Sequence, residues 1–209
     1  RWIQNLPQIT SGINITRVEV YVLNRNNDTQ TLRNVVGLMD LGESSRIYNS
    51  AVQGLGGNRP TANNANNLFS IVTDENAEHL YRDPDAVNSS LEALFAGENN
   101  NGTDFEKITA ARKLSPTEYT FHPQLGYITL TRKLQNDEAL AVAYEYTTST
   151  GGPYKVGELT DDVARLNDEK IIYLKLLRPR KVSIRDQNNR IIPTWDLMMK
   201  NIYSLNVNQ

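Results

Sequence analysis

The sequence predicts an α+β domain: an antiparallel β-sandwich or sheet with a helical insertion at about residues 60–114 and a C-terminal amphipathic helix. Apolar residues alternate with a period of two in segments on either side of this insertion, which is typical of half-buried strands. Within the insertion the apolar period becomes that of a helix. Because strands and helices follow one another in blocks, we expect the α+β class and not alternating βα units.

Composition supports a folded domain and excludes several kinds of site. The chain has 209 residues, with 22 basic and 24 acidic side chains, 39% hydrophobic residues and no cysteine. Its nearly neutral charge gives no electrostatic basis for binding nucleic acid. Without cysteine there are no disulfides, thiolate nucleophiles or cysteine-ligated zinc sites. No run of about 18 apolar residues occurs, so no transmembrane helix is expected.

The first expected strand covers residues 15–23, where valines at alternate positions share one face. Asparagine and aspartate side chains at 24–28 favour a turn after it. The following segment, 40–67, is rich in Gly, Asn and Ser. Its glycines at 54–57 lack the spacing of a phosphate-binding loop, so we expect a surface loop.

The insertion is expected to hold three helices. Residues 68–72 form a short apolar face, and Asp85 is a candidate cap for a second helix with an apolar face made by Val87, Leu91, Leu94 and Phe95. A capping-box pattern follows, in which Thr103 would cap a third helix and Glu106 would bond back to the Thr103 amide. This third helix is expected to end near Lys113.

The period returns to two after residue 115. A hairpin is expected around a turn at 123–126, followed by a strand at 140–146 whose alanines form one face. Such a face indicates close approach by another layer. A Gly-Gly-Pro turn then precedes an extended segment at 154–159, and residues 170–177, apolar on both faces, are expected to form a central strand.

Two elements are expected near the C-terminus. A hairpin is predicted from strands at 181–185 and 190–192. A helix from Pro193 would place on one face Trp195, Met198, Met199 and Ile202. We favour packing of this face on the sheet, with a groove for a protein partner as the alternative. Residues 165–200 carry nine basic and four acidic side chains, which we interpret as a solvated face, with a docking patch as the alternative.

Motifs for catalysis or metal binding are not found. His79 and His122 lack ligand spacing, and no serine-hydrolase elbow or EF-hand pattern occurs. Capping or turns explain the carboxylate pairs Asp104/Glu106, Asp137/Glu138 and Asp161/Asp162. We therefore expect no catalytic, cofactor-binding or metal-ligating residue, no cofactor and no enzymatic activity. Because the chain starts without an initiator methionine or signal sequence, we expect residues 1–209 to be a single soluble domain excised from a larger protein, with a helical subdomain at 60–114.

Several short strings occur in a fixed order along most of the chain. They are ITRVEVYVLNR at 15–25, VGLMDLGE at 36–43, DFEK at 104–107, ARKLS at 111–115, EYT at 118–120, LGYITL at 125–130, DEALAVAYEYT at 137–147, YKVGE at 154–158, KLL at 175–177 and PTWDLMMKNIYSL at 193–205. In this order the strings resemble the SprA/Sov family, the outer-membrane translocon of the type IX secretion system of Bacteroidetes, which is also tied to gliding motility.

The resemblance implies a function and a location. Members of this family form a very large β-barrel pore with soluble insertions, and this chain would be one such insertion. It would be a non-enzymatic module that supports protein export and gliding motility through structural or protein–protein contacts. Its partners would be other parts of the translocon, accessory subunits or secreted cargo. It would lie at the outer membrane, in a periplasmic, luminal or extracellular portion of a cell-surface protein.

A second hypothesis is a ligand- or carbohydrate-binding β-sandwich module of a bacterial surface protein. Its binding platform would be built from exposed aromatic rings. The candidate rings are Tyr127, Tyr144, Tyr146 and Tyr154. A hydrolase that uses the carboxylate pairs is a remote third hypothesis.

Overall fold

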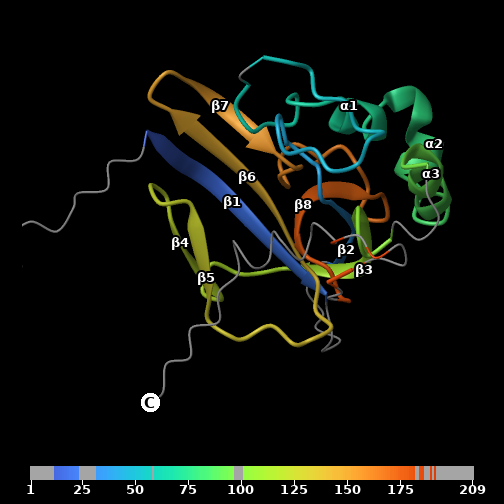
Figure 1. Cartoon of the computed structure of the whole chain (residues 1–209). Helices are drawn as coiled ribbons and strands as arrows, with labels where there is room; N and C mark the ends of the chain where they lie inside the picture. The colour runs from blue at the N-terminus through green and yellow to red at the C-terminus, as the bar shows by residue number, and fades with distance from the viewer. Residues whose placement is uncertain are drawn as a thin grey trace, which may run out of the picture.

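A closed sheet organises the part of the chain that the computed structural model describes, which is residues 12–23, 32–57, 59–96, 101–181, 184–185, 189 and 191. Its strands are β1 (Ile13–Leu23), β2 (Leu32–Leu38), β3 (Phe105–Lys113), β4 (Tyr119–His122), β5 (Tyr127–Leu130), β6 (Leu140–Thr148), β7 (Gly151–Val156) and β8 (Ile172–Arg178). Five strands pair in the order β1–β3–β2–β8–β6, and β6 pairs again with β1, which closes a barrel-like ring (Figure 1).

Pairing in the ring is antiparallel except between β2 and β8, which run parallel. β6 pairs with β1 along its whole length, while β8 and then β7 occupy its other edge. The expected central strand at 170–177 is confirmed as β8, which lies between β2 and β6. The α+β class holds, but the main strands form one closed, mixed sheet and not an antiparallel sandwich.

The narrow interior of the ring explains the alanines of β6. Ala139, Ala141 and Ala143 are fully buried and belong to an interior cluster with Tyr21, Val35, Ile108, Ala111, Leu159, Val163, Ile172 and Leu174. A ring of five strands has less room inside than the eight-stranded barrels that side chains just fill, so one wall must carry small residues. The close approach expected behind the alanine face is therefore found.

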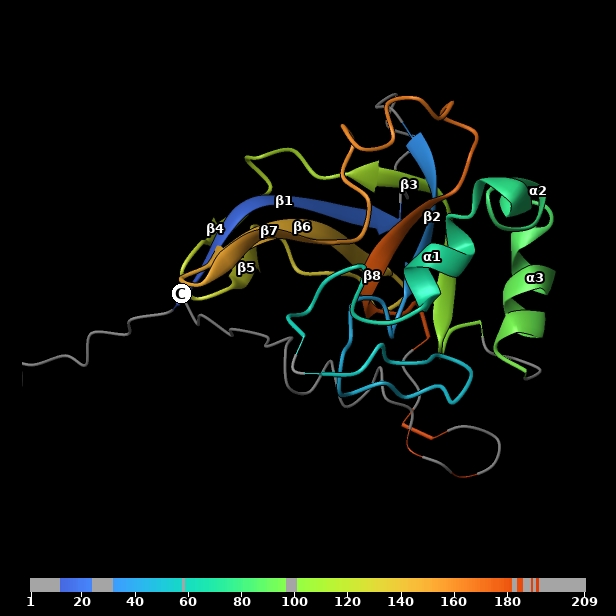
Figure 2. The same cartoon turned by 90° about the horizontal axis from the view of Figure 1, so that it is seen from above.

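Two separate covers bury the outer surface of the ring. The helical segments α1 (Leu68–Val72), η1 (Glu75–Ala77), α2 (Glu78–Tyr81) and α3 (Val87–Leu94) lie beside β2 and β8, and the β4–β5 hairpin packs against β1 and β6. Figures 1 and 2 show the helices and the hairpin at opposite ends of the sheet. No helix in the described residues has the length and apolarity needed to cross a membrane.

The expected third helix is wrong, because most of residues 103–113 form β3. Glu106 does not bond back to Thr103; its buried carboxylate forms an ion pair with Arg180. Thr103 donates its hydroxyl to the Asp104 carboxylate and caps no helix. In the described residues the helical elements therefore run from residue 68 to residue 94, and not over 60–114.

A bulge in β3 gives two of its interior residues the spacing of a helix. On β2, the partners of Ile108 and Ala111 are Val35 and Arg33, and a single residue lies between them. On β3, two residues, Thr109 and Ala110, lie between Ile108 and Ala111. Ile108 and Ala111 thus both belong to the interior cluster although they are three positions apart. This spacing matches one turn of a helix, and Ala110 accommodates the bulge with a φ of 56°.

Other boundaries differ in smaller ways. Asp85 does not cap α3, whose N-cap is Ala86; instead the Asp85 amide donates to the Asp83 carboxylate. β2 has no counterpart among the expected strands, and β7 begins at Gly151, before the expected residue 154.

Of the two elements expected near the C-terminus, only part of the hairpin falls within the described residues. An isolated antiparallel bridge between Arg185 and Ile191 lies where the last hairpin is expected. The turn at 24–28 and the helix from Pro193 lie outside the described residues.

Replacing Ala110 by glycine is expected to raise the free energy of unfolding by about 0.5–1 kcal/mol. A Cβ in the left-handed region costs about 1–2 kcal/mol, and the greater freedom of glycine in the unfolded chain offsets part of the gain. Urea denaturation of Ala110→Gly measures this difference. Ala93→Gly, on the exposed face of α3, is the matched control and should lower stability by about 0.5–1 kcal/mol. Equal losses in the two variants would contradict the assignment of strain to Ala110.

Candidate functional site

Residues from several of the resembling strings meet in one buried polar region. Lys175 on β8 donates from Nζ to Glu43 Oε1 at 2.7 Å and to the Met39 carbonyl. Asn66 donates from Nδ2 to the carbonyls of Asp40 and Glu43, at 2.8 and 2.9 Å. The turn after β2 is thus held between β8 and the loop that precedes α1.

Asp40 lies in the same turn and is 4% exposed. Burial raises the pKa of the Asp40 carboxyl above its usual value, although hydrogen bonds from the amides of Asn49 and Tyr48 and the charge of Lys175 act to lower it. A buried carboxyl with a raised pKa beside a lysine is a pattern of acid–base sites. Both side chains, however, are enclosed and bonded to the protein, so we interpret this region as a support for the segment at 44–49.

A second buried polar group joins the helical segments to the sheet. Arg82, which follows α2, donates from Nη2 and Nη1 to the two carboxylate oxygens of Glu158, each at 2.6 Å. Glu158 also accepts from the Tyr173 amide at 2.8 Å, and the guanidinium lies 5.3 Å from the centre of the Tyr173 ring. The side chains of Arg82 and Glu158 are 4% and 8% exposed, so the pair is shielded from solvent.

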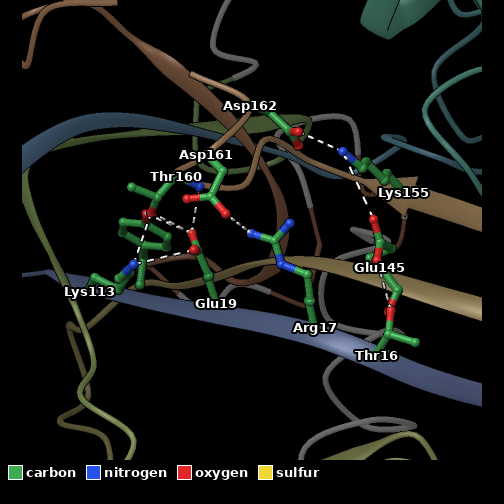
Figure 3. Close-up of polar contacts among 10 residues, drawn as sticks. Thr16, Arg17, Glu19, Lys113, Glu145, Lys155, Thr160, Asp161 and Asp162 are labelled. Carbon is green, nitrogen blue, oxygen red and sulfur yellow. Dashed lines mark hydrogen bonds and ion pairs between the residues drawn. The ribbon is translucent and has the colours of Figure 1, made fainter. Parts of the chain in front are cut away.

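Figure 3 shows a polar network at the end of the ring that the loop between β7 and β8 covers. Glu19 on β1 accepts from the amide and the hydroxyl of Thr160 at 3.0 and 2.8 Å, and pairs with Lys113 at 3.3 Å. Two further ion pairs tie the same loop to the sheet: Arg17 with Asp161, and Lys155 with Asp162. These contacts hold Leu159 and Val163 of the loop inside the ring.

Two loops with the same local structure flank the β4–β5 hairpin. In the first, Arg112 donates two hydrogen bonds, 2.7 and 2.8 Å long, to Glu118, which also accepts from the Ser115 amide at 2.9 Å. In the second loop, Arg132 donates two hydrogen bonds, 2.9 and 2.8 Å long, to Glu138. Glu138 likewise accepts, at 2.8 Å, from the amide of residue 135. We call segments 112–118 and 132–138 the clasp loops.

The clasp loops also share sequence, although none of the motifs considered above predicted them. Segment 112–118 is RKLSPTE and segment 132–138 is RKLQNDE. In both, the arginine lies six residues before the glutamate and the leucine packs under the hairpin. The charges of Glu118 and Arg132 also interact, which links one loop to the other. The repeated Arg-Lys-Leu is the signal that could have revealed these loops.

The four candidate tyrosines do not form one exposed platform. Tyr127 is 52% exposed and stacks on His122, with ring centres 5.6 Å apart. Tyr146 is 6% exposed and donates its hydroxyl to the Thr61 carbonyl at 2.7 Å. Tyr144 and Tyr154 are half-buried, and their ring centres lie 6.1 and 5.4 Å from that of Tyr146. A platform made of all four rings is therefore wrong.

The other candidate groups are separated and bonded within the chain. His79 lies in α2 and His122 in β4, on opposite covers of the sheet. Each residue of the three pairs has an interaction partner in the protein. Among the described residues, no group of three or more His, Asp or Glu side chains is placed to hold a metal ion. In the basic segment, Arg178 and Arg185 donate to backbone carbonyls.

Comparison with known protein families finds no matching family model, and comparison with curated proteins finds no relative. The family resemblance therefore depends on the strings given above.

Replacing Arg82 by methionine is expected to lower the free energy of unfolding by about 3–5 kcal/mol, because Glu158 would remain buried without its counter-ion. Urea denaturation measures the loss. The double variant Arg82→Met/Glu158→Leu is expected to be more stable than Arg82→Met, since it removes the uncompensated charge. Arg165→Met, which breaks an ion pair whose side chains are 64% and 74% exposed, is the control and should cost less than about 0.5 kcal/mol. A similar small loss in Arg82→Met would contradict this role.

The Arg112–Glu118 pair of the first clasp loop is expected to make the stability of the domain depend on pH. Hydrogen bonds from Arg112 lower the pKa of Glu118 to about 2, from 4.5. Because the folded-state pKa is the lower one, this stabilisation is complete above pH 4.5 and is lost as the pH falls toward 2. At pH 7, Glu118→Gln should cost about 1–2 kcal/mol, and its difference from the wild type should shrink between pH 5 and pH 2. Chemical denaturation between pH 5 and pH 2 measures this difference, with Glu75→Gln as the exposed control. A difference between the wild type and Glu118→Gln that stays constant with pH would contradict the prediction.

Proposed function

We propose that this chain is a non-enzymatic module of an outer-membrane translocon similar to SprA/Sov, where it supports type IX protein export and gliding motility. The proposal is supported by the position of the resembling strings in the fold: several of them lie in a central strand of the sheet and in buried polar contacts. Residues 140–147 of the string at 137–147 lie in β6, the strand with three neighbours in the sheet. The strings at 36–43 and 154–158 contribute Asp40, Glu43 and Glu158 to buried polar contacts.

The strings thus coincide with residues that determine the fold. A rigid domain inserted into a larger machine needs such residues, because it acts through its shape and its contacts. Its partners would be other parts of the translocon, accessory subunits or secreted cargo. We place it at the outer membrane, in a periplasmic, luminal or extracellular portion of its parent protein.

Cell fractionation tests the identity of the parent protein. An antibody raised against this chain is expected to detect a very large polypeptide in the outer-membrane fraction of the source bacterium. Detection of a small soluble protein instead would overturn the proposal.

Secretion assays test the role of the module. The chromosomal change Arg82→Met is expected to reduce cargo in the medium and gliding of the cells several-fold, because a loss of a few kcal/mol depletes the folded domain. The matched change Arg165→Met should leave both unchanged. The amount of parent protein in the outer membrane is measured in parallel. If limited proteolysis shows that the domain is unfolded in the Arg82→Met parent and cargo is still exported normally, the module has no role in export.

A further inference from the structure

A shallow cavity lies at the end of the sheet where β1 begins and β6 ends. Figure 1 shows these two strand ends side by side. Its volume is about 310 Å³, at the lower end of the range for small-molecule sites. The residues that line it are Gly12, Ile13, Asn14, Gln124, Thr147, Thr148 and Ser149. Three different segments therefore meet there: the start of β1, the turn of the β4–β5 hairpin and the end of β6.

The sheet and the hairpin fix the shape of this cavity. Asn14 lies directly opposite Thr147 in the β1–β6 ladder, and the Ser149 amide donates to the Gly12 carbonyl at 2.9 Å. The Ile15 amide donates to the Pro123 carbonyl at 2.9 Å, which holds the turn carrying Gln124 against β1. The cavity is therefore built on strand backbones and does not depend on a single loop.

Polar groups in the lining are available to a ligand. Gln124 and Asn14 are exposed, and neither amide group has a hydrogen-bond partner in the described part of the chain. The same holds for the Thr147 hydroxyl. This contrasts with the buried polar groups around Asp40 and Arg82, which are bonded to the protein. None of the described lining residues is charged.

We propose that this cavity binds an uncharged saccharide. Side-chain amides and hydroxyls both donate and accept hydrogen bonds, as sugar hydroxyl groups do. The nearest charges along the strands, on Arg17 and Glu145, are already paired with Asp161 and Lys155, so the cavity offers nothing for a charged ligand. The exposed Tyr127 ring stacks on His122 and is not among the residues that line the cavity, so recognition of the sugar depends on the amides and hydroxyls alone.

The inference is independent of the proposed role in secretion. It requires neither a translocon nor a protein partner, and a failure of saccharide binding would leave the export proposal untouched. It uses none of the four tyrosines, only the amides and hydroxyls of β1, β6 and the hairpin turn.

Nuclear magnetic resonance titration of the full chain tests the inference. The probes are cellotriose, maltotriose and chitotriose, with glucuronate as a charged probe and tri-alanine as a peptide probe. At least one neutral trisaccharide is expected to shift the side-chain amide signals of Asn14 and Gln124 in a saturable way, with weaker effects from glucuronate and tri-alanine. Each of the variants Asn14→Ala and Gln124→Ala should weaken binding about tenfold.

Gln135→Ala is the matched control, because it removes an exposed glutamine on the second clasp loop, away from the cavity. It should bind as the wild type does. The chain's denaturation midpoint should be the same in all variants, since Asn14 and Gln124 make no side-chain hydrogen bonds in the described structure. The inference is overturned if no trisaccharide saturates, if tri-alanine or glucuronate binds more tightly, or if the Asn14 and Gln124 variants bind normally.

Discussion

The buried ion pair between Arg82 and Glu158 connects parts of the chain that are distant in sequence. Besides Glu158, Arg82 contacts Ile171 twice: its side chain donates to the Ile171 carbonyl, and its own carbonyl accepts from the Ile171 amide. Glu158 and Ile171 lie at the two ends of the loop between β7 and β8, so one arginine fixes both ends of that loop. Because the loop places Leu159 and Val163 inside the ring, the packing of the interior depends on a residue of the helical cover.

The clasp loops hold the β4–β5 hairpin against the sheet, just as Arg82 holds the helical segments against it. The β4–β5 hairpin pairs with no strand of the main sheet. A two-stranded hairpin is marginal by itself, so it needs both an apolar surface beneath it and restraint at its ends. Its apolar residues pack on Val20, Val22 and Val142, and the Arg112–Glu118 and Arg132–Glu138 pairs restrain the chain just before and after it. The outer face of the ring is thus buried at each end by a cover that is held through arginine–carboxylate pairs.

The sequence predicted β1, β6 and the β4–β5 hairpin from the alternation of their side chains, and β8 from a run of residues that is apolar on both faces. At β3 a capping-box pattern predicted a helix, and the bulge that gives Ile108 and Ala111 a helix-like spacing did not contradict it. No strand was expected at β2. The polar contacts escaped prediction for another reason. Arg82 and Glu158 are 76 positions apart, and nothing local in the sequence marks them as partners. The clasp loops are local and repeated, so they were within reach of a search for internal repeats. For the cavity, the sequence marked neither Asn14 nor Gln124 as a binding residue, because only the fold brings the hairpin turn to the start of β1.

The distribution of satisfied polar groups indicates where this domain contacts other molecules. A buried charge already paired within the protein has little to offer a partner, and disturbing it is costly. That description fits Arg82, Lys175 and Asp40, so these residues serve the fold. The amides of Asn14 and Gln124 are different, because they are exposed, unpaired within the described structure and held by strand pairing at the end of the sheet away from the helices. A rigid body that carries these unpaired amides at one end is suited to being anchored elsewhere while it presents that end to a ligand. This arrangement is compatible with an insertion in a larger surface protein, and it makes the hairpin end the first place to look for binding.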